Sequence, residues 1–300
     1  MSRHVLDLAA LGEEALEEIV DLAGREPASL GAPLAGRGAA LIFEKPSNRT
    51  RHSTEMAVVQ LGGHPIYTRG EEVGLDVREP VEDVARVLAG YHAVLAARVF
   101  DHTTLVRMAA VCPVPVVNLL SDVAHPLQAV ADLLTMRNEY GVIRGRSVCW
   151  IGDYNNVARS LAEACALQGA ALRFACPEGH GADEAELGRL LALGAASVEQ
   201  YRDPRLAASG SCAVHTDTWT SMGQEDEAAV RRLEFAGFTV DESVMAAALP
   251  DAVFMHCLPA HRGEEVVGAV IDGSASRIVP QAHNRLHAAR AVLAWTMGVR

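Results

Sequence analysis

The sequence contains no apolar run as long as the eighteen or so residues that a membrane-spanning helix needs. The start of the chain also lacks the apolar stretch of a secretory signal, and the acidic residues Glu13 and Glu14 follow soon after it. An Arg-rich transit peptide is not indicated either. We therefore expect a cytoplasmic protein that does not insert into a membrane.

Closely spaced cysteines are also lacking. The six cysteines are scattered, with no C-x-x-C pair among Cys112, Cys149, Cys165, Cys176, Cys212 and Cys257. A disulfide framework or a zinc ribbon would need a more regular spacing. The cysteines are therefore predicted to be reduced thiols.

Positive charge is scarce relative to negative charge. Lys and Arg number 26 while Asp and Glu number 38, which gives a formal net charge of -12. Such a chain is a poor general binder of nucleic acids or anionic membranes, so neither is expected as a partner. An anionic small molecule could bind only in a local basic pocket.

The sequence does contain enough apolar material for a sizeable core. Hydrophobic residues make up 50% of the chain and charged residues 21%, which argues against a disordered protein. A length of 300 residues fits one large domain or two ordinary ones. The sequence shows neither a solenoid-type repeat nor a low-complexity segment.

Short apolar runs alternate with segments of helical periodicity along most of the chain. The predicted strands are 39–43, 66–67, 93–97 and 114–118 in the first half, and 147–151, 171–175, 212–216 and 252–255 in the second. Helices are predicted to end near Leu61 and to span 81–91, 126–140, 157–168 and 280–297. This rhythm predicts an α/β fold with two domains, each a mostly parallel sheet flanked by helices.

A domain boundary is predicted after the helix 126–140. Gly141 and Gly145 follow that helix, a pattern typical of a helix end and of a hinge. We expect a first domain at 1–138, a second at 139–279, and a final helix within 280–300. Ligands of parallel sheets bind at the carboxyl ends of the strands, so the strand-to-helix junctions are the places to look for chemistry.

The first such junction has the features of an anion-binding site. Ser47 is a good N-cap for the helix that follows, and the free backbone N–H groups there favour a phosphate. Arg49 adds a guanidinium suited to bidentate contact with a phosphate, while Arg51 is interpreted as a structural residue in an ion pair. The G-x-x-x-x-G-K spacing of a P-loop is absent. From these residues alone, an ordinary capped helix with solvated arginines remains an alternative.

The segment from Phe43 to Arg51 resembles the carbamoyl-phosphate motif of the aspartate/ornithine carbamoyltransferase family. Six further motifs of that family follow in the same order and extend the resemblance over essentially the whole chain. They are Arg98-Val99-Phe100, His125-Pro126-Leu127-Gln128, Gly152-Asp153-Tyr154-Asn155-Asn156, Asp217 to Gly223, Phe254-Met255-His256-Cys257-Leu258-Pro259, and Asn284-Arg285-Leu286-His287.

The resemblance implies a transferase of arginine biosynthesis that moves the carbamoyl group of carbamoyl phosphate to the δ-amine of L-ornithine. The products would be L-citrulline and phosphate, and no cofactor or metal would be required. Members of the family form homotrimers or multiples of trimers with active sites at subunit interfaces. The segment around Glu79 and Pro80 resembles the loop that a neighbouring subunit contributes. The final helix is expected to return to the first domain.

The resemblance also implies which residues bind carbamoyl phosphate. Arg98 and His125 would polarise the carbonyl as negative charge grows on its oxygen, and such donors are each worth about 3–4 kcal/mol in a transition state. Gln128, one helical turn beyond His125, would accept from the carbamoyl NH₂ group. Without the resemblance, His125 would be interpreted as a surface histidine at a helix start. The full implied set is Ser47, Asn48, Arg49, Thr50, Arg98, His125, Gln128, Cys257, Leu258 and Arg285.

For ornithine, the implied ligands are Asn156, Asp217, Ser221 and Met222, and the implied catalytic residues are Arg98, His125, Asp217 and Cys257. Only a small fraction of an amine with a pKa near that of lysine, about 10.4, is neutral and nucleophilic at neutral pH. Cys257 is expected to orient this amine or to accept its proton, without a covalent intermediate. A buried structural thiol is the alternative. A protease-like dyad with His256 is disfavoured because adjacent strand residues point to opposite faces.

The chain departs from the family pattern in places. Asn48 stands where threonine is usual, and Tyr154 where glycine is common. Two acids that usually precede Arg285 are replaced by Gln281 and His283. None of these changes puts an incompatible residue at an expected ligand position.

Other functions fit the sequence less well. An aspartate-using enzyme should lack the S-M-G and H-C-L-P segments, and the S-M-G segment also argues against N-acetylornithine or putrescine as substrate. A nucleotide-dependent oxidoreductase is disfavoured because the G-x-G-x-x-G spacing is missing after Ile151. A non-catalytic relative should have lost at least one of the expected site residues, yet Arg49, Arg98, His125, Asp217 and Cys257 are all present.

Overall fold

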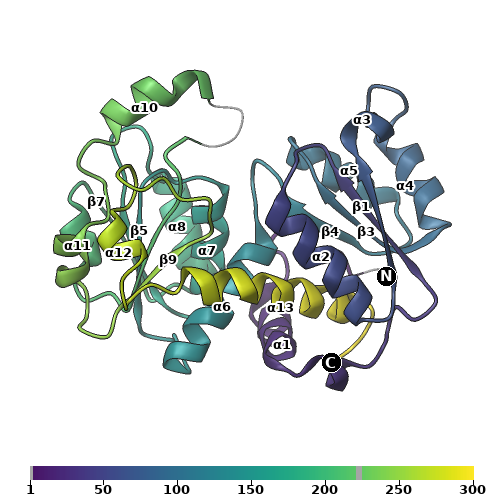
Figure 1. Ribbon diagram of the computed structural model, residues 1–300, viewed down its shortest axis with the longest axis horizontal. Helices are drawn as coiled ribbons and strands as arrows, with labels where there is room; N and C mark the ends of the chain where they lie inside the picture. Colours follow the sequence, from purple (N-terminus) through teal and green to yellow (C-terminus); the bar gives the residue numbers. More distant parts are fainter. Residues whose placement is uncertain (1–2, 221–224) are drawn as a thin grey trace. The chain divides into compact units, whose positions relative to one another are not determined.

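A computed structural model describes residues 3–220 and 225–300 of the chain (Figure 1). It divides into two compact units, which we describe separately. Unit 1 comprises Met1–Leu134 and His283–Arg300, and unit 2 comprises Thr135–Ala282. The first division falls within a helix, ahead of Gly141 and Gly145. Ser221 and Met222, which we expected to bind ornithine, lie outside the described residues.

Unit 1 is built on a four-stranded parallel sheet in the order β2-β1-β3-β4. Its strands are β1 (Gly38–Phe43), β2 (His64–Arg69), β3 (His92–Arg98) and β4 (Val116–Leu120). Its helices are α1 (Gly12–Gly24), η1 (Pro27–Leu30), α2 (Asn48–Gln60), α3 (Gly70–Val73), α4 (Val81–Ala89) and α5 (His102–Val111), and α6 (Pro126–Tyr140) begins in this unit. All seven residues of β3 are buried, as a central parallel strand requires.

The predicted helices of unit 1 are present as α2, α4 and α6, whereas α1, α3 and α5 were not predicted. The Ser47 hydroxyl accepts from the backbone N–H of Thr50 at 3.4 Å, so Ser47 is the N-cap of α2 as expected. Helix α4 buries Val81, Val84 and Ala85 against the core of the sheet. Arg51 forms the expected ion pair, at 2.8 Å from Glu55 one turn later.

Unit 2 contains a five-stranded parallel sheet in the order β7-β6-β5-β8-β9. The strands are β5 (Ser147–Ile151), β6 (Ala171–Ala175), β7 (Ser197–Tyr201), β8 (Ala213–Thr216) and β9 (Val253–His256). The helices are α7 (Asn156–Leu167), α8 (Glu184–Leu193), α9 (Pro204–Ala208), η2 (Glu225–Glu227), α10 (Ala228–Glu234), α11 (Glu242–Ala247) and α12 (Gly268–Ile271). The predicted α/β class with parallel sheets is confirmed.

The strand order reverses direction within each sheet. In unit 1 the chain passes from β1 to one neighbour and then to the other, and in unit 2 it does the same around β5. At such a point the connections leave on opposite sides, which opens a crevice at the carboxyl ends of the strands. The residues after β1, β3, β5 and β8 are therefore positioned for ligand binding.

The last helix, α13 (Ile278–Thr296), belongs to unit 1 from His283 onward, so the expected return of the C-terminal helix to the first domain is confirmed. Its buried Arg290 donates to Gln60 Oε1 at the end of α2, at 2.9 Å. Trp295 Nε1 donates to Glu18 Oε2 of α1 at 2.7 Å. None of the helices in the described ranges is long and apolar enough to cross a bilayer.

Candidate active site

The anion-binding segment of unit 1 divides into exposed and buried residues. Ser47 is the N-cap of α2, and the three residues after it form the first turn of this helix. Thr50 is buried, whereas Asn48 and Arg49 are exposed to solvent. The segment thus offers an anion a helix N-terminus, one buried hydroxyl and an exposed guanidinium.

Two buried arginines flank a histidine at the same edge of the unit 1 sheet. Arg98 ends β3, His125 immediately precedes α6, and Arg285 comes from α13. One Arg285 nitrogen donates to Thr50 Oγ1 at 3.4 Å. Burial, and then the positive charges of Arg285 and Arg98, hold the pKa of His125 well below its ordinary value. The imidazole is therefore neutral beside two cations, an arrangement that suits a polar anion with a carbonyl group.

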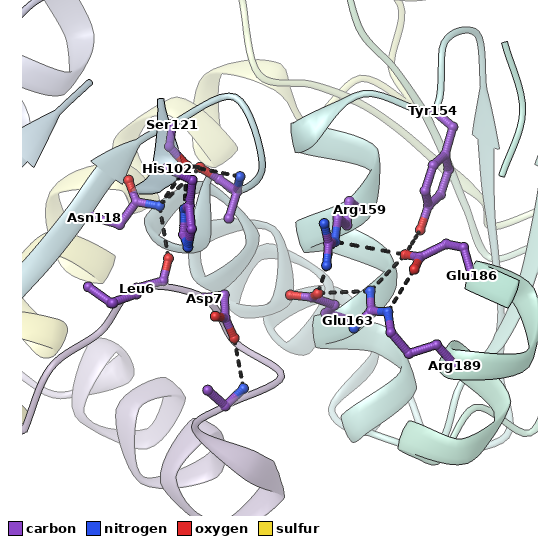
Figure 2. A network of polar contacts seen from close by, with 12 residues as sticks. Leu6, Asp7, His102, Asn118, Ser121, Tyr154, Arg159, Glu163, Glu186 and Arg189 are labelled. Carbon is purple, nitrogen blue, oxygen red and sulfur yellow. Dashed lines mark hydrogen bonds and ion pairs between the residues drawn. The ribbon is translucent and has the colours of Figure 1, made fainter. Parts of the chain in front are cut away.

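The turn that carries His125 is fixed by a network around Asn118 (Figure 2). The Asn118 amide nitrogen donates to the carbonyl oxygen of Leu6 at 2.8 Å and to Ser121 Oγ at 3.2 Å. Ser121 Oγ in turn lies 2.8 Å from His102 Nδ1 and accepts from the backbone N–H of Ala124 at 3.2 Å. Because Ala124 directly precedes His125, this network sets where α6 begins.

Gln128 lies in the first turn of α6 and is buried. Its amide nitrogen donates to Asp132 Oδ1 at 2.8 Å. This contact orients the side-chain amide, whose oxygen can accept from a ligand. The acceptor role expected of Gln128 stays a prediction.

In unit 2, Asp217 lies between Asn155 and Cys257. The Cys257 thiol donates to Asp217 Oδ1 at 3.2 Å, and the Asn155 amide nitrogen donates to Asp217 Oδ2 at 3.2 Å. These residues follow the adjacent strands β5, β8 and β9 at their carboxyl ends. Asp217 and Cys257, both expected in the site, are thus brought together by direct contact.

Asn155 is a site residue that the sequence reasoning did not assign. Its side-chain oxygen caps α7 by accepting from the backbone N–H groups of Val157 and Ala158, both at 3.0 Å. The same side chain reaches Asp217, so one residue both starts the helix and orients the carboxylate. Asn156, which we expected to bind ornithine, is the first residue of α7, and its role stays a prediction. The helix-capping position of Asn155 was the signal that could have identified it.

Tyr154, one of the departures from the family pattern, anchors the loop before Asn155 (Figure 2). Its hydroxyl donates to Glu186 Oε1 at 2.8 Å, and its ring meets Phe174 edge-on at 5.3 Å between centroids. Glu186 is held in turn by Arg189, which also lies 2.9 Å from the buried Glu163. The Tyr154 side chain is therefore held by a hydrogen bond to α8. Gly152, two residues earlier, has a positive φ of 123°.

The pairing of Asp153 with Arg231 is a second feature that no sequence motif indicated. Arg231, on α10, is ion-paired with Asp153 and also donates to the carbonyl oxygen of Trp219. Burial raises the pKa of Asp153, although the nearby Arg231 opposes this rise. The pair connects the loop after β5 with the segment that follows Asp217.

Among the residues that the structure describes, two groups of side chains have metal-ligating atoms close together. The first group consists of Asp217, His256 and Cys257, and the second of His261, Glu264 and Glu265. In each group the potential ligand atoms lie within 4.8 Å of one another. The donors of the first group are engaged in protein contacts, because His256 Nδ1 accepts from the Leu258 N–H and Cys257 donates to Asp217. The expectation that the reaction needs no metal stays a prediction.

A buried histidine on β8 makes the stability of the protein depend on pH. Burial, and then the nearby His256, lower the pKa of His215 to about 3. A histidine in the unfolded chain has a pKa of about 6.5 and binds a proton as the pH falls below this value, whereas His215 in the folded chain stays unprotonated. The folded state is therefore destabilised relative to the unfolded state as the pH decreases below about 6.5. We expect His215 alone to cost about 2 kcal/mol of unfolding free energy between pH 7.5 and pH 5.

Urea unfolding followed by fluorescence tests this expectation, because Trp150 pairs with His215 across the sheet. Between pH 7.5 and pH 5, the unfolding free energy of His215→Met should fall by about 2 kcal/mol less than that of the wild type. The exposed His52 provides the control, and His52→Gln should leave the loss unchanged. An equal loss in His215→Met and in the wild type would contradict the assignment.

Comparison with known proteins gives consistent matches over both units. The aspartate/ornithine carbamoyltransferase carbamoyl-P binding domain matches residues 3–138, and the Asp/Orn binding domain of the same family matches residues 144–296. Ornithine carbamoyltransferase of Thermus thermophilus is 46% identical over 295 residues, covering 98% of this chain and 96% of that protein.

Solved structures are similar as well. Ornithine carbamoyltransferase from Pyrococcus furiosus has a TM-score of 0.92 at 42% identity, covering 99% of this chain and 97% of that one. Acetylornithine transcarbamylase complexed with acetylcitrulline has a TM-score of 0.88 at 28% identity, covering 99% of each chain. The fold alone therefore does not separate these two substrates.

Proposed function

Because the chain belongs to the aspartate/ornithine carbamoyltransferase family, we propose that it transfers the carbamoyl group of carbamoyl phosphate to the δ-amine of L-ornithine. The products are L-citrulline and phosphate. The observation that carries the proposal is the convergence of Arg98, Arg285 and a neutral His125 beside Thr50. This cluster is complementary to a small acyl phosphate, in which a phosphate is bonded to a reactive carbonyl.

On the carbamoyl-phosphate side, the phosphate is bound by the N-terminus of α2 and by arginine. Arg98 and His125 donate to the carbonyl oxygen, where negative charge develops as the amine attacks. The Gln128 oxygen accepts from the carbamoyl NH₂ group, which fixes the orientation of the carbonyl. The proposed ligands are Ser47, Asn48, Arg49, Thr50, Arg98, His125, Gln128, Cys257, Leu258 and Arg285.

On the ornithine side, Asp217 supplies the negative charge that holds the α-ammonium group. Ser221 and Met222 help to hold the α-amino and carboxylate ends, and Asn156 lies on the carboxylate side. Cys257 orients the δ-amine. The neutral amine attacks the carbonyl carbon, a C–N bond forms, and the bond from that carbon to the phosphate oxygen breaks. Phosphate leaves with the electron pair and carries away the proton lost by nitrogen.

The experiment that tests this function is citrulline formation with ornithine, N-acetylornithine, putrescine and aspartate assayed in parallel. We expect turnover with ornithine, increasing between about pH 6 and about pH 10 as the fraction of neutral δ-amine grows. Turnover with another amine and not with ornithine would overturn the substrate assignment while leaving the carbamoyl-phosphate site in place. Absence of turnover with every amine would overturn the function.

We also propose that the chain assembles as a homotrimer, as the family resemblance implies. Ile66 on the edge strand β2 and Tyr91 before β3 are exposed by 46% and 72%, and both line a hollow of about 580 Å³ in unit 1. Exposed apolar side chains around a hollow are typical of a surface that another chain covers. A second copy of this chain is the proposed occupant.

Sedimentation of the wild type and of Tyr91→Glu tests this assembly. The wild type should sediment with the mass of a trimer, and the charged variant should dissociate. Val142→Glu places the same charge on an exposed apolar site of unit 2 and should remain a trimer. A monomeric wild type would overturn the proposal.

A further inference from the structure

We infer that His256 and Glu265 form a buried pair that positions the segment from Cys257 to His261. The inference rests on the proposed function, because Cys257 and Leu258 in this segment are the residues proposed to contact the reacting groups. Neither His256 nor Glu265 is assigned to a substrate. Their role is to hold the backbone from which the site residues project.

The pair contacts the segment at both of its ends. The side chains of His256 and Glu265 are completely buried, and His256 Nε2 lies 3.1 Å from Glu265 Oε1. His256 Nδ1 accepts from the backbone N–H of Leu258 at 2.8 Å. Glu265 Oε1 also accepts from the backbone N–H of His261 at 2.6 Å. Two backbone groups of the segment are thus fixed by one pair of side chains.

The hydrogen bonds determine where the imidazole proton resides. The Leu258 N–H needs a lone pair at His256 Nδ1, so the neutral ring carries its proton on Nε2 and donates it to Glu265. Burial raises the pKa of Glu265, but the hydrogen bonds from His256 and from the His261 N–H outweigh this and leave the pKa below its usual value. The carboxylate is therefore ionised and accepts from both donors.

The backbone of Leu258 provides a second, independent observation. Its φ is +61°, in the left-handed region that a branched side chain rarely adopts. Such a conformation persists only where the surrounding structure holds it. The hydrogen bond from the Leu258 N–H to His256 acts on this very residue, so loss of the Nδ1 acceptor releases the constraint.

The consequence for catalysis passes through Cys257. This residue lies between His256 and Leu258, and its thiol is 3.2 Å from Asp217 Oδ1. A displacement of about 1 Å at a reacting group can cost about 100-fold in rate. His256 and Glu265 are therefore positioning residues, and their loss should lower the turnover number more than it weakens the binding of carbamoyl phosphate.

Two substitutions of His256 separate its two hydrogen bonds. Asparagine places an amide oxygen near the position of Nδ1, so His256→Asn keeps an acceptor for Leu258 and loses the donor to Glu265. Glutamine places an amide nitrogen near Nε2, so His256→Gln keeps the donor and loses the acceptor. In His256→Gln we expect kcat to fall at least about tenfold, while KM for carbamoyl phosphate changes less than about twofold. In His256→Asn we expect kcat to be substantially closer to the wild-type value.

Alkylation of Cys257 gives a readout that needs no substrate. Of the six cysteines, all in described ranges, Cys257 is the one that is not buried, so the fast phase of iodoacetamide labelling reports on it. We expect the labelling rate to change in His256→Gln and to stay near the wild-type value in His256→Asn. His215→Gln removes another buried histidine, from the neighbouring strand, and should leave the rate unchanged.

The outcomes distinguish this inference from the proposed function. A wild type that makes no citrulline would overturn the proposed function. The labelling rates of Cys257 would still test whether His256 and Glu265 position the segment. Equal losses in both His256 variants with unaltered labelling would indicate a structural role alone and overturn the inference. If neither variant folds, Glu265→Gln, which keeps an accepting oxygen, is compared with Glu265→Leu, and equal labelling rates in these two would likewise overturn it.

Discussion

Replacement of Arg98 by methionine is expected to lower kcat/KM for carbamoyl phosphate by at least about 100-fold. Arg98 ends the fully buried strand β3 and lies near the neutral His125. A guanidinium in a buried site stabilises negative charge on the carbonyl oxygen far better than one in water. The loss of one such donor costs about 3–4 kcal/mol in the transition state, and methionine preserves most of the packing volume.

Initial rates with carbamoyl phosphate varied at saturating ornithine provide the measurement. The matched control is Arg86→Met, because Arg86 is an exposed arginine of the same unit, paired with Asp83 on the surface of α4. Its rate should equal that of the wild type. Arg98→Lys restores a point charge without the planar fork and should recover only part of the loss. A change of less than about threefold in Arg98→Met would contradict the proposed role.

The sequence predicted most reliably the elements whose signals are local. The bounds of β5, β6 and α6 agree with those expected at 147–151, 171–175 and 126–140. Each has an apolar run or a helical period between clear turn residues. The edge strand β7 (Ser197–Tyr201) was missed because it is only half-buried and carries polar residues in place of an apolar run.

The site was predictable to the extent that its residues cap helices or follow strands. Ser47 has the expected N-cap role, and Asp217 and Cys257 meet as the ends of adjacent strands should. From the sequence, Asn48, Arg49 and Thr50 are equally good candidates for binding the phosphate, yet of these three residues only Thr50 is buried. Whether a side chain in the first turn of a helix is buried depends on which distant residues pack over it. The local sequence pattern does not predict these contacts.

Contacts between residues distant in sequence were not predictable from spacing. Arg285 reaches Thr50 across 235 positions, and only the family resemblance indicated their common site. The pair of His256 and Glu265 carries no motif of its own, since a histidine at the end of a strand has many possible partners. The role of the pair follows from the backbone N–H groups from which it accepts hydrogen bonds, and only the three-dimensional structure identifies these groups.

The second large effect is expected for Asp217→Asn, which should lower kcat/KM for ornithine by at least about 100-fold while changing KM for carbamoyl phosphate little. Both oxygens of Asp217 accept from donors, one from the Cys257 thiol and the other from the Asn155 amide nitrogen. Asparagine offers one oxygen and one NH₂ group, so one of these neighbours would face another donor. The substitution also removes the charge proposed to hold the α-ammonium group of ornithine.

Initial rates with each substrate varied in turn separate the two halves of the site. Asp272→Asn is the matched control, because Asp272 is an exposed acid of unit 2 that pairs with Arg262 on the surface. A comparable loss for both substrates in Asp217→Asn would contradict an ornithine-specific role. Because Asp217 joins the loop after β5 to the segment after β9, a general collapse of this edge would also lower the stability of the protein in urea. A selective loss of ornithine use with unaltered urea unfolding would thus assign the effect to Asp217 itself.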